Sequence, residues 1–357
     1  MMFASSRASL KRWERSRRRF LSYGVLFVGS AVVSACGGDR STADRSATES
    51  TAQSGSNGDF SVAILLPQTI DDGSWSQAGY ASLEQIQQEL GARISYVENI
   101  DFMDEAAVVE EYRKLAEAGY QFIIGHGSQH LTLPAAETVA TEFPRTQVAV
   151  VAGQGPGNNN NLGILNFQDA ELGYLAGVVA GLKTQSGTVS FMGGFDYPNL
   201  VMTADRYTRG VQSQRPDATV LIDWLNSWTD ETKAKTTAQQ HIAAGADIIA
   251  VNAEPAGLPI HSKAAALGIH TIGWYQDQYE RSPDRVLTSA IQNIDVLLLT
   301  AATLVRRGQW EGRQYYLGLA DGAIALAPFR DALTAEEAAQ VQAIQEAIIT
   351  GEIDVLS

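Results

Sequence analysis

Residues 166–194 read NFQDAELGYLAGVVAGLKTQSGTVSFMGG and mark the middle of the globular part of the chain. Apolar and small residues over 172–182 predict a buried helix, and the short apolar run at 188–192 predicts a strand. On both sides of this stretch, short apolar strands alternate with longer helical patterns. Such alternation predicts parallel sheets covered by helices on both faces. Two runs of it predict an α/β fold of two doubly wound parallel-sheet lobes.

The same reading assigns the other elements. In the first half, strands are expected at 60–66, 92–97, 122–125 and 147–152, with helices at 75–90 and 105–118. In the second half, strands are expected at 188–192, 219–224, 247–251 and 270–273, with helices at 232–244, 259–267 and 334–350. Open parallel sheets bind ligands at the carboxyl ends of their strands. The loops that follow these strands are therefore the expected place of a binding site.

The first 35 residues predict a signal peptide. An arginine cluster over 15–19 precedes an apolar core at 23–33, and small residues separate that core from Cys36. The core is shorter than the about 20 apolar residues that a membrane helix needs, so cleavage is expected rather than permanent anchoring. The segment SRRRFL at 16–21 resembles a twin-arginine export signal, and an ordinary export signal is the alternative.

Cys36 is the only cysteine of the chain and directly follows Val-Ser-Ala. It resembles the attachment cysteine of a bacterial lipoprotein, with a buried structural cysteine as the alternative. A diacyl anchor supplies the two chains that stable membrane attachment requires. We therefore expect lipidation at Cys36 and an extracytoplasmic protein held at the cell membrane, with residues 36–59, rich in Gly, Ser and Thr, as a flexible tether.

The charge balance argues against a nucleic-acid partner. Residues 1–35 hold seven of the 26 Lys and Arg residues and one of the 40 Asp and Glu residues, so the chain without them carries a net charge of −20. Binding of a phosphate backbone needs a clustered positive surface, and an acidic protein is repelled by an anionic bilayer. The lipid, not the protein surface, is expected to hold the chain at the membrane.

Several loops after predicted strands carry side chains suited to binding. In the first half these are PQTIDDGSWSQ at 67–77 and GHGSQ at 125–129, and in the second half NSWTD at 226–230, NAE at 252–254 and GWYQD at 273–277. The candidate ligand-binding residues are Asp72, Trp75, Ser76, Gln77, His126, Trp228, Asp230, Glu254, Tyr275, Asp277 and Gln292.

The sequence carries no catalytic or metal motif. His126 and His130 are four residues apart, but Gly127 and the absence of Glu between them do not fit a zinc-binding helix. His126 is expected either to line the cleft as a neutral group or to satisfy the backbone at a strand end. No Gly-x-Ser-x-Gly elbow is present. We expect neither an enzyme nor a cofactor.

Five further motifs carry a family resemblance. DDGSWSQAGY at 71–80 and the central block at 166–194 are similar to segments of the basic membrane lipoproteins, the substrate-binding proteins of nucleoside-type ABC importers. WTDETKAK, IGWYQDQ, VLTSAIQNID and GLADGAIALAP follow in the family order, so that the resemblance covers about Phe60 to Phe329.

The resemblance implies a type I periplasmic-binding-protein fold with a three-segment hinge. Lobe one would comprise 60–167 and 278–311, and lobe two would comprise 168–277 and 312–357. The lobes would close over a small purine-like ligand and hand it to an ABC permease in the cytoplasmic membrane.

Within the resemblance, Trp75 and Trp228 match the aromatics that stack on the base, which suits the large face of an indole. Asp72 matches an acidic residue that accepts hydrogen bonds from the base, although Asp-Gly is also a turn signal and Asp is a common helix cap. Ser76 and Gln77 match a family Asn imperfectly.

Two positions depart from the family pattern. Tyr275 and Gln292 stand where nucleoside-binding members carry Asp and Lys, which would bind ribose hydroxyls. The departures predict a ribose end without charged partners, and hence a free base, a modified purine or another flat heterocycle. A receptor that presents a ligand to a membrane signalling partner is the alternative function, and a calcium-dependent nucleoside hydrolase is disfavoured because the loops lack an aspartate cluster.

Overall fold

The computed structural model describes residues 60–152, 155–253 and 255–356. All of them belong to one compact unit that spans 54–357. The predicted signal peptide, the tether and Cys36 lie outside the described residues. Within the part of the chain that is described, no helix combines the length and apolar character needed to cross a membrane.

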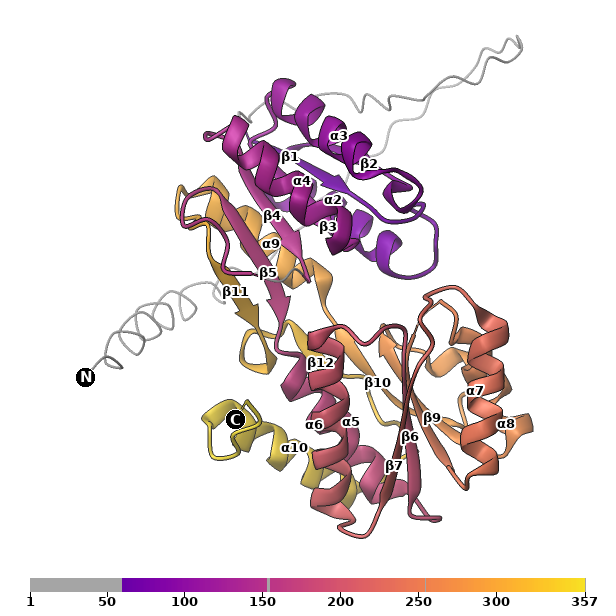
Figure 1. The fold of residues 1–357 in the computed structure, drawn as a ribbon. Helices are drawn as coiled ribbons and strands as arrows, with labels where there is room; N and C mark the ends of the chain where they lie inside the picture. Colours follow the sequence, from indigo (N-terminus) through magenta and orange to yellow (C-terminus); the bar gives the residue numbers. More distant parts are fainter. Residues whose placement is uncertain (1–59, 153–154, 254, 357) are drawn as a thin grey trace, which may run out of the picture. The chain divides into compact units, whose positions relative to one another are not determined.

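The first lobe is built on a six-stranded sheet with the order β11-β5-β4-β3-β1-β2, in which every pairing is parallel (Figure 1). Its strands are β1 (Ser61–Leu65), β2 (Arg93–Val97), β3 (Phe122–His126), β4 (Gln147–Val151), β5 (Leu162–Phe167) and β11 (Gln314–Leu317). Helices α2 (Trp75–Leu90) and α9 (Ile294–Arg306) cover one face, and α3 (Glu105–Glu117) and α4 (Gln129–Glu142) cover the other. A short 3-10 turn, η1 (Ile100–Phe102), follows β2.

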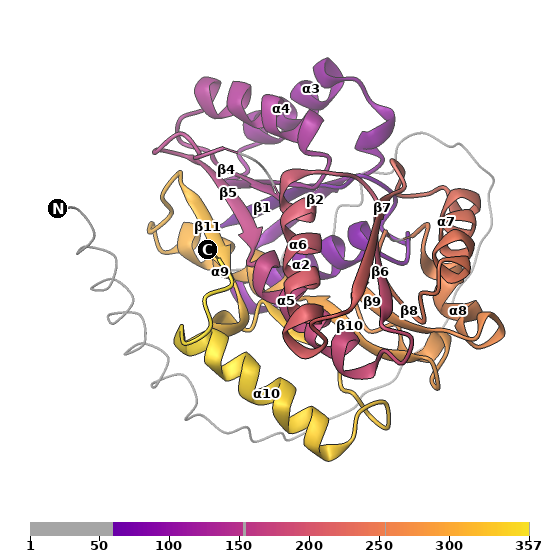
Figure 2. The same cartoon turned by 60° about the horizontal axis from the view of Figure 1, so that its bottom comes forward.

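The second lobe repeats the plan with the order β12-β10-β9-β8-β6-β7, in which only β12 is antiparallel. Its strands are β6 (Thr188–Gly193), β7 (Thr219–Trp224), β8 (Ile248–Asn252), β9 (His270–Tyr275), β10 (Val286–Gln292) and β12 (Ile324–Leu326). Its helices are α5 (Asp169–Lys183), α6 (Pro198–Gln214), α7 (Glu231–Ala243), α8 (Leu258–Leu267) and α10 (Ala335–Thr350), with short turns η2 (Tyr279–Arg281) and η3 (Leu319–Asp321). Helix α10 packs beside α5 at the edge of this lobe (Figure 2).

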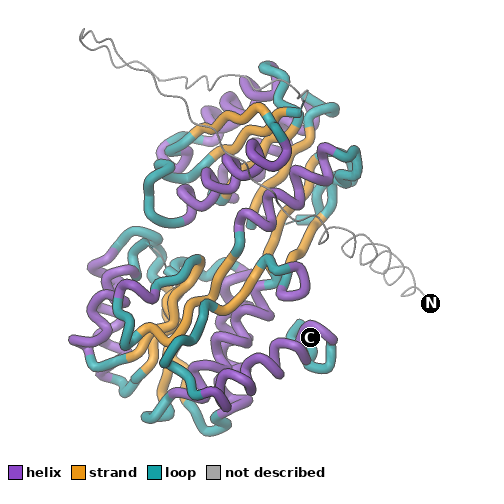
Figure 3. Tube along the Cα trace, turned by 180° about the vertical axis from the view of Figure 1, so that it is seen from behind, coloured by secondary structure: helices purple, strands orange, loops and turns teal. Residues whose placement is uncertain are grey.

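The apolar strands are buried on both faces, as parallel sheets require. In β1, Val62 and Ile64 belong to the core under α2 and α9, whereas Ala63 and Leu65 belong to the core under α3 and α4. Because side chains alternate along a strand, a continuous apolar run supplies both cores. Figure 3 shows the resulting layers, with strands between helices in each lobe. The predicted fold class, two doubly wound lobes, is confirmed.

The boundaries predicted for the lobes are wrong at two of three crossings. The first crossing lies at Gln168, between β5 and α5, as expected. However, β10 pairs with β9 of the second sheet, so the chain returns at Asn293 and not near Asp277. Likewise β11 pairs with β5 of the first sheet, which moves the last crossing from 310–312 to Gly318. Periodicity identifies a strand but does not state which sheet edge it joins.

The central block fixes α6 against α5. Gly173, Gly177 and Gly181 recur every four residues on α5, and a Cβ at Gly173 or Gly181 would meet the α6 backbone. The two helices therefore pack with their backbones close together. This packing brings the first turn of α6 beside the first turn of α5, at the end of the lobe where the chain crosses between the sheets.

Candidate ligand-binding site

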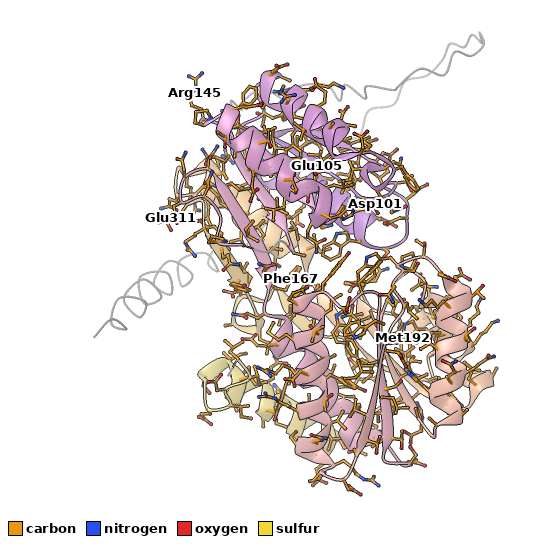
Figure 4. The ribbon with its side chains drawn as sticks, in the orientation of Figure 1. Asp101, Glu105, Arg145, Phe167, Met192 and Glu311 are labelled. Atoms are coloured by element: carbon orange, nitrogen blue, oxygen red, sulfur yellow. The ribbon has the colours of Figure 1, made fainter. Side chains whose placement is uncertain are left out.

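A cavity of about 360 Å³ lies between the lobes and takes its lining from both of them. First-lobe residues come mainly from the loops after β1 and β3, with Asp101 after β2, and second-lobe residues mainly from the loops after β6, β7, β8 and β9. In each sheet the strand order reverses beside its first strand, at β1/β3 and at β6/β8. The cavity thus lies at the carboxyl ends of the strands and at the switch point of both sheets, where open α/β sheets bind ligands. In Figure 4, Asp101 stands on the first lobe and Phe167 where the chain passes between lobes; both line the cavity.

Trp75, at the start of α2, forms the first-lobe wall. Its ring lies over the His126 ring at 4.5 Å with an interplanar angle of 7°, and its Nε1–H donates to the His126 carbonyl at 3.2 Å. In return, His126 Nε2–H donates to the Trp75 carbonyl at 3.0 Å. Gly127 is needed here because a Cβ at its φ of 89° would lie 2.8 Å from the Trp75 indole nitrogen. The indole is therefore held in one place before any ligand arrives.

His126 supports the site from behind. It is fully buried, does not line the cavity, and burial lowers its pKa to about 4. At neutral pH it is an uncharged ring under Trp75. Of the two roles predicted for His126, satisfying backbone at a strand end is the one seen, and the placement of His126 on the cleft wall is wrong.

Trp228 forms part of the second-lobe wall with two neighbours. Phe195 and Tyr197 are stacked at 5.2 Å, and Phe195 lies 5.5 Å from the Trp228 ring. Gly194 is required beneath them, since a Cβ there would overlap the Trp228 ring. Tyr275 completes the aromatic lining and contacts Trp75 of the other lobe edge-on at 5.6 Å.

Asp72 lines the cavity but has most of its acceptor capacity occupied. Its carboxylate accepts the backbone N–H groups of Ser74, Ser76 and Gln77 at 2.8, 2.9 and 3.0 Å. These are the unpaired donors at the start of α2, so the carboxylate caps that helix. The Ser76 hydroxyl accepts from the Gln68 N–H at 3.0 Å.

A second polar cluster, around Asp169, also lines the cavity. Gln292 Nε2 donates to Asp169 Oδ1 at 2.7 Å, and Asn199 Nδ2 approaches Asp169 Oδ2 at 3.5 Å. Asp169 is only 7% exposed, and burial raises the pKa of its carboxyl to about 6. The predicted absence of charged groups near Gln292 is therefore wrong, because a carboxylate lies beside it.

The predicted residues divide into two groups. Asp72, Trp75, Ser76, Trp228, Tyr275 and Gln292 all line the cavity. Gln77, Asp230 and Asp277 do not: Asp230 caps α7 through the Lys233 N–H, and Asp277 pairs with Arg330 at 2.7 Å. Glu254 lies outside the described residues.

The lining residues that sequence reasoning missed include Asp169, Phe195, Tyr197 and Asn199. The segment FDYPN at 195–199 directly follows the predicted strand 188–192, so the rule used for the other loops would have found three of them. Asp169 follows β5 (Leu162–Phe167), a strand that the sequence analysis did not predict, so the rule was not applied there.

Two contacts join the walls across the cavity. Besides the Trp75–Tyr275 ring contact, Gln276 Nε2 of the second lobe donates to the Gly73 carbonyl of the first at 2.8 Å. Tyr275 has a φ of 65°, in the left-handed region that disfavours side chains with a Cβ. The described lobes are thus in direct contact at this side of the cavity.

The sequence of residues 60–357 matches the Bmp family model, described as ABC transporter substrate-binding protein, PnrA-like. The chain belongs to this family. It is 24% identical to the transcriptional activator protein med of Bacillus subtilis over 75% of this chain and 82% of that protein. It is also 24% identical to a purine-binding protein of Brucella abortus over 72% of each chain.

A solved structure shows the same fold. The ABC transporter solute-binding protein of Aeropyrum pernix aligns with a TM-score of 0.70 and 21% identity, covering 83% of this chain and 92% of that one. As a Bmp family member, the chain is a substrate-binding protein of the ABC transporter type, which is an extracytoplasmic binding protein and not an enzyme.

Proposed function

We propose that this Bmp family protein captures a purine base, a purine nucleoside or a similar flat heterocycle and delivers it to an ABC permease. The observation that carries the proposal is the pair of aromatic walls, Trp75 from one lobe and Trp228 from the other, that line a single cavity. Stacking of a base on an aromatic side chain contributes about 1–3 kcal/mol. An indole on each lobe couples ligand binding to lobe closure.

The size of the cavity suits this class. Its volume of about 360 Å³ is at the lower end of the about 300–1,000 Å³ seen for small-molecule sites. Its lining surface is mostly apolar, and both lobes contribute polar side chains to it. The name of the Brucella abortus relative, a purine-binding protein, supports the same ligand class.

Calorimetric titration of the full chain with adenine, guanine, hypoxanthine and their nucleosides tests the ligand class. We expect saturable binding of at least one of them and none of glucose, which lacks a flat aromatic face. The order of base and nucleoside reports whether Asp169 replaces the missing Lys as a partner of the ribose. Binding of glucose, or of no purine, would contradict the proposal.

We further propose that residues 1–35 direct export and that a lipid on Cys36 holds the protein at the membrane. The small residues before this single thiol support the assignment. Metabolic labelling with a fatty-acid analogue should mark the wild-type chain and leave Cys36→Ser unlabelled. A labelled Cys36→Ser variant would disprove attachment at this residue.

A sensing role is the second candidate, favoured by the relative named a transcriptional activator. In that case the same cleft would present the ligand to a membrane signalling partner. Deletion of the gene separates the two: an importer component is needed for uptake of radiolabelled purine, whereas a sensor changes transcription and leaves uptake intact.

A further inference from the structure

The described lining of the cavity has negative side chains but no permanently positive one. Asp72, Asp101 and Asp169 contribute carboxylates, no Lys or Arg is present among the described lining residues, and His130 is the basic side chain there. The Arg330 guanidinium is bound to Asp277, and neither lines the cavity. A phosphate or carboxylate ligand would meet repulsion here and find no permanently positive partner.

The hydrogen-bond partners of these carboxylates among the described residues are neutral. Asp72 accepts backbone N–H groups, and Asp101 accepts from the Gln68 amide at 2.9 Å and from the Ser128 hydroxyl. Asp169 accepts only from amides. Of the three, only Asp169 is buried, and an ionised carboxylate away from water is costly unless a cation compensates it. Within the described part of the chain no side chain compensates Asp169, which leaves that role to a ligand.

The cluster around Asp169 also presents unpaired acceptors. An ionised carboxylate can only accept, so it orients the amide nitrogens of Gln292 and Asn199 toward itself. Gln292 Oε1 and Asn199 Oδ1 are then turned elsewhere, and both are buried without a partner in the described structure, as is Oδ1 of Asn252, a residue only 1% exposed. All three residues line the cavity. A ligand that satisfies them must bring hydrogen-bond donors.

The remaining walls are aromatic. Trp75, Phe195, Tyr197, Trp228 and Tyr275 line the same space. Aromatic faces attract cations, and most strongly so where water is excluded. The carboxylate of Asp101, on the first lobe, is close enough to Tyr197 of the second lobe to help raise the pKa of that phenol, together with burial, which is the larger cause. Negative charge and aromatic faces therefore converge on the cavity from both lobes.

We propose that the cavity selects a flat heteroaromatic cation that carries hydrogen-bond donors, in preference to neutral ligands of the same shape, and that it excludes anions. The inference rests on the proposed function, because it names the charge of the ligand that the same cleft takes. The positive ring lies among the aromatic faces, and its donors meet Asp169, Asn199 and Gln292.

Two ligand pairs test the charge preference by calorimetry on the full chain. The first is 1-methyladenosine, cationic at neutral pH, against adenosine; the second is nicotinamide riboside, a pyridinium, against its neutral dihydro form. We expect the cation to bind at least about tenfold tighter in one pair or both, and adenosine 5′-phosphate not to bind. A preference below tenfold in both pairs, or binding of the phosphate, overturns the inference. If adenosine binds in that case, the proposed function still stands; if no purine binds, it falls too.

Variants locate the preference. Asp169→Asn removes the charge with little change of shape, and we expect the cation-to-neutral affinity ratio to fall at least about fivefold while the affinity for adenosine changes less. Asp101→Asn changes an exposed residue and is an independent test, for which we expect a smaller fall in the cation-to-neutral affinity ratio. Asp217→Asn, an exposed carboxylate outside the lining, is the matched control and should leave the ratio unchanged. An unchanged ratio in both Asp169→Asn and Asp101→Asn overturns the inference.

Discussion

The two walls of the cavity are built on opposite principles. On the first lobe Asp72 caps α2, and Trp75 and His126 exchange hydrogen bonds, although Ser74 Oγ and His126 Nδ1 have no partner in the described structure. On the second lobe, Asn199, Asn252 and Gln292 each keep a buried oxygen without a partner in the described structure. The first wall is therefore a preformed stacking surface, whereas the second presents three unpaired acceptors to a ligand. We infer that the first lobe contributes affinity through stacking and the second contributes selectivity.

The largest expected effect contrasts the two indoles. Trp75→Ala should lower the free energy of unfolding by up to about 3 kcal/mol, because it uncovers buried His126 and removes a packed ring. Trp228→Ala should lower the free energy of unfolding less, since the Trp228 ring is not stacked on a buried histidine as the Trp75 ring is. Each should weaken purine binding by about 1–3 kcal/mol. Urea unfolding and calorimetry measure both quantities. Equal stability losses would mean that the first wall is no more preformed than the second.

The second prediction concerns Asp169. Its folded pKa of about 6 lies above the ordinary 3.8, so folding favours the protonated form and ionisation destabilises the native state. The penalty is absent below pH 3.8, grows between 3.8 and about 6, and reaches up to about 3 kcal/mol above that. Its hydrogen-bond partners Asn199 and Gln292 do not titrate.

Asp169→Asn should accordingly stabilise the free protein at pH 7.5 and have a much smaller effect near pH 4. Denaturant titrations at the two pH values measure this, with Asp217→Asn as the control. If Asp169→Asn is less stable than the wild type at pH 7.5, the carboxylate is already compensated in the free protein. That result would contradict the inference that the second wall needs a ligand to satisfy its polar groups.

Asp72 provides a sharper test of the first wall. Asn keeps one acceptor oxygen for the N–H groups of Ser74 and Gln77 but loses the acceptor for the Ser76 N–H, so Asp72→Asn should lose less stability than Asp72→Ala, for which we expect a loss of about 0.5–2 kcal/mol. Thermal denaturation compares the two variants. If Asp72 instead accepts hydrogen bonds from the ligand, as the sequence suggested, Asp72→Asn would weaken purine binding strongly, beyond its small effect on stability.

The smallest effect is expected at the contact between lobes. Gln276→Glu preserves size but removes the N–H that donates to the Gly73 carbonyl, which should shift the balance toward an open form by about 0.5–1.5 kcal/mol. Small-angle scattering without ligand should show a larger radius of gyration. Gln276→Asn, which retains a donor on a shorter side chain, is the comparison. An unchanged radius would indicate that the Trp75–Tyr275 contact alone holds the lobes together.

Much of the fold was predictable because local periodicity reports burial. The apolar runs at 61–65, 122–126 and 248–252 are strands buried on both faces, as expected. The assignment of 286–292 to a lobe failed, because its sheet is chosen by pairing with β9 across the intervening residues 276–285. Pairing of this kind depends on contacts that no local pattern records.

The site was predictable where a residue follows a strand and unpredictable where it does not. Trp75, Trp228 and Tyr275 line the cavity because strand ends converge at one edge of a sheet. Among such residues, however, the sequence did not distinguish those that line the cavity from those that do not. His126 is stacked beneath Trp75, and Asp277 forms an ion pair with Arg330.

The sequence by itself determined the alternation of strands and helices, the two lobes, and the aromatic residues at strand ends, because these follow from side-chain periodicity and chain direction. Only the tertiary structure decided that Asp169, Asn199 and Gln292 meet. They come from α5, α6 and β10, and Asp169 and Gln292 are 123 residues apart in the sequence. The glycine stripe of α5 sets the approach of α6, and the pairing of β10 with β9 sets the third member. The partners of a buried carboxylate are fixed by packing between elements, which the sequence specifies only through the whole fold.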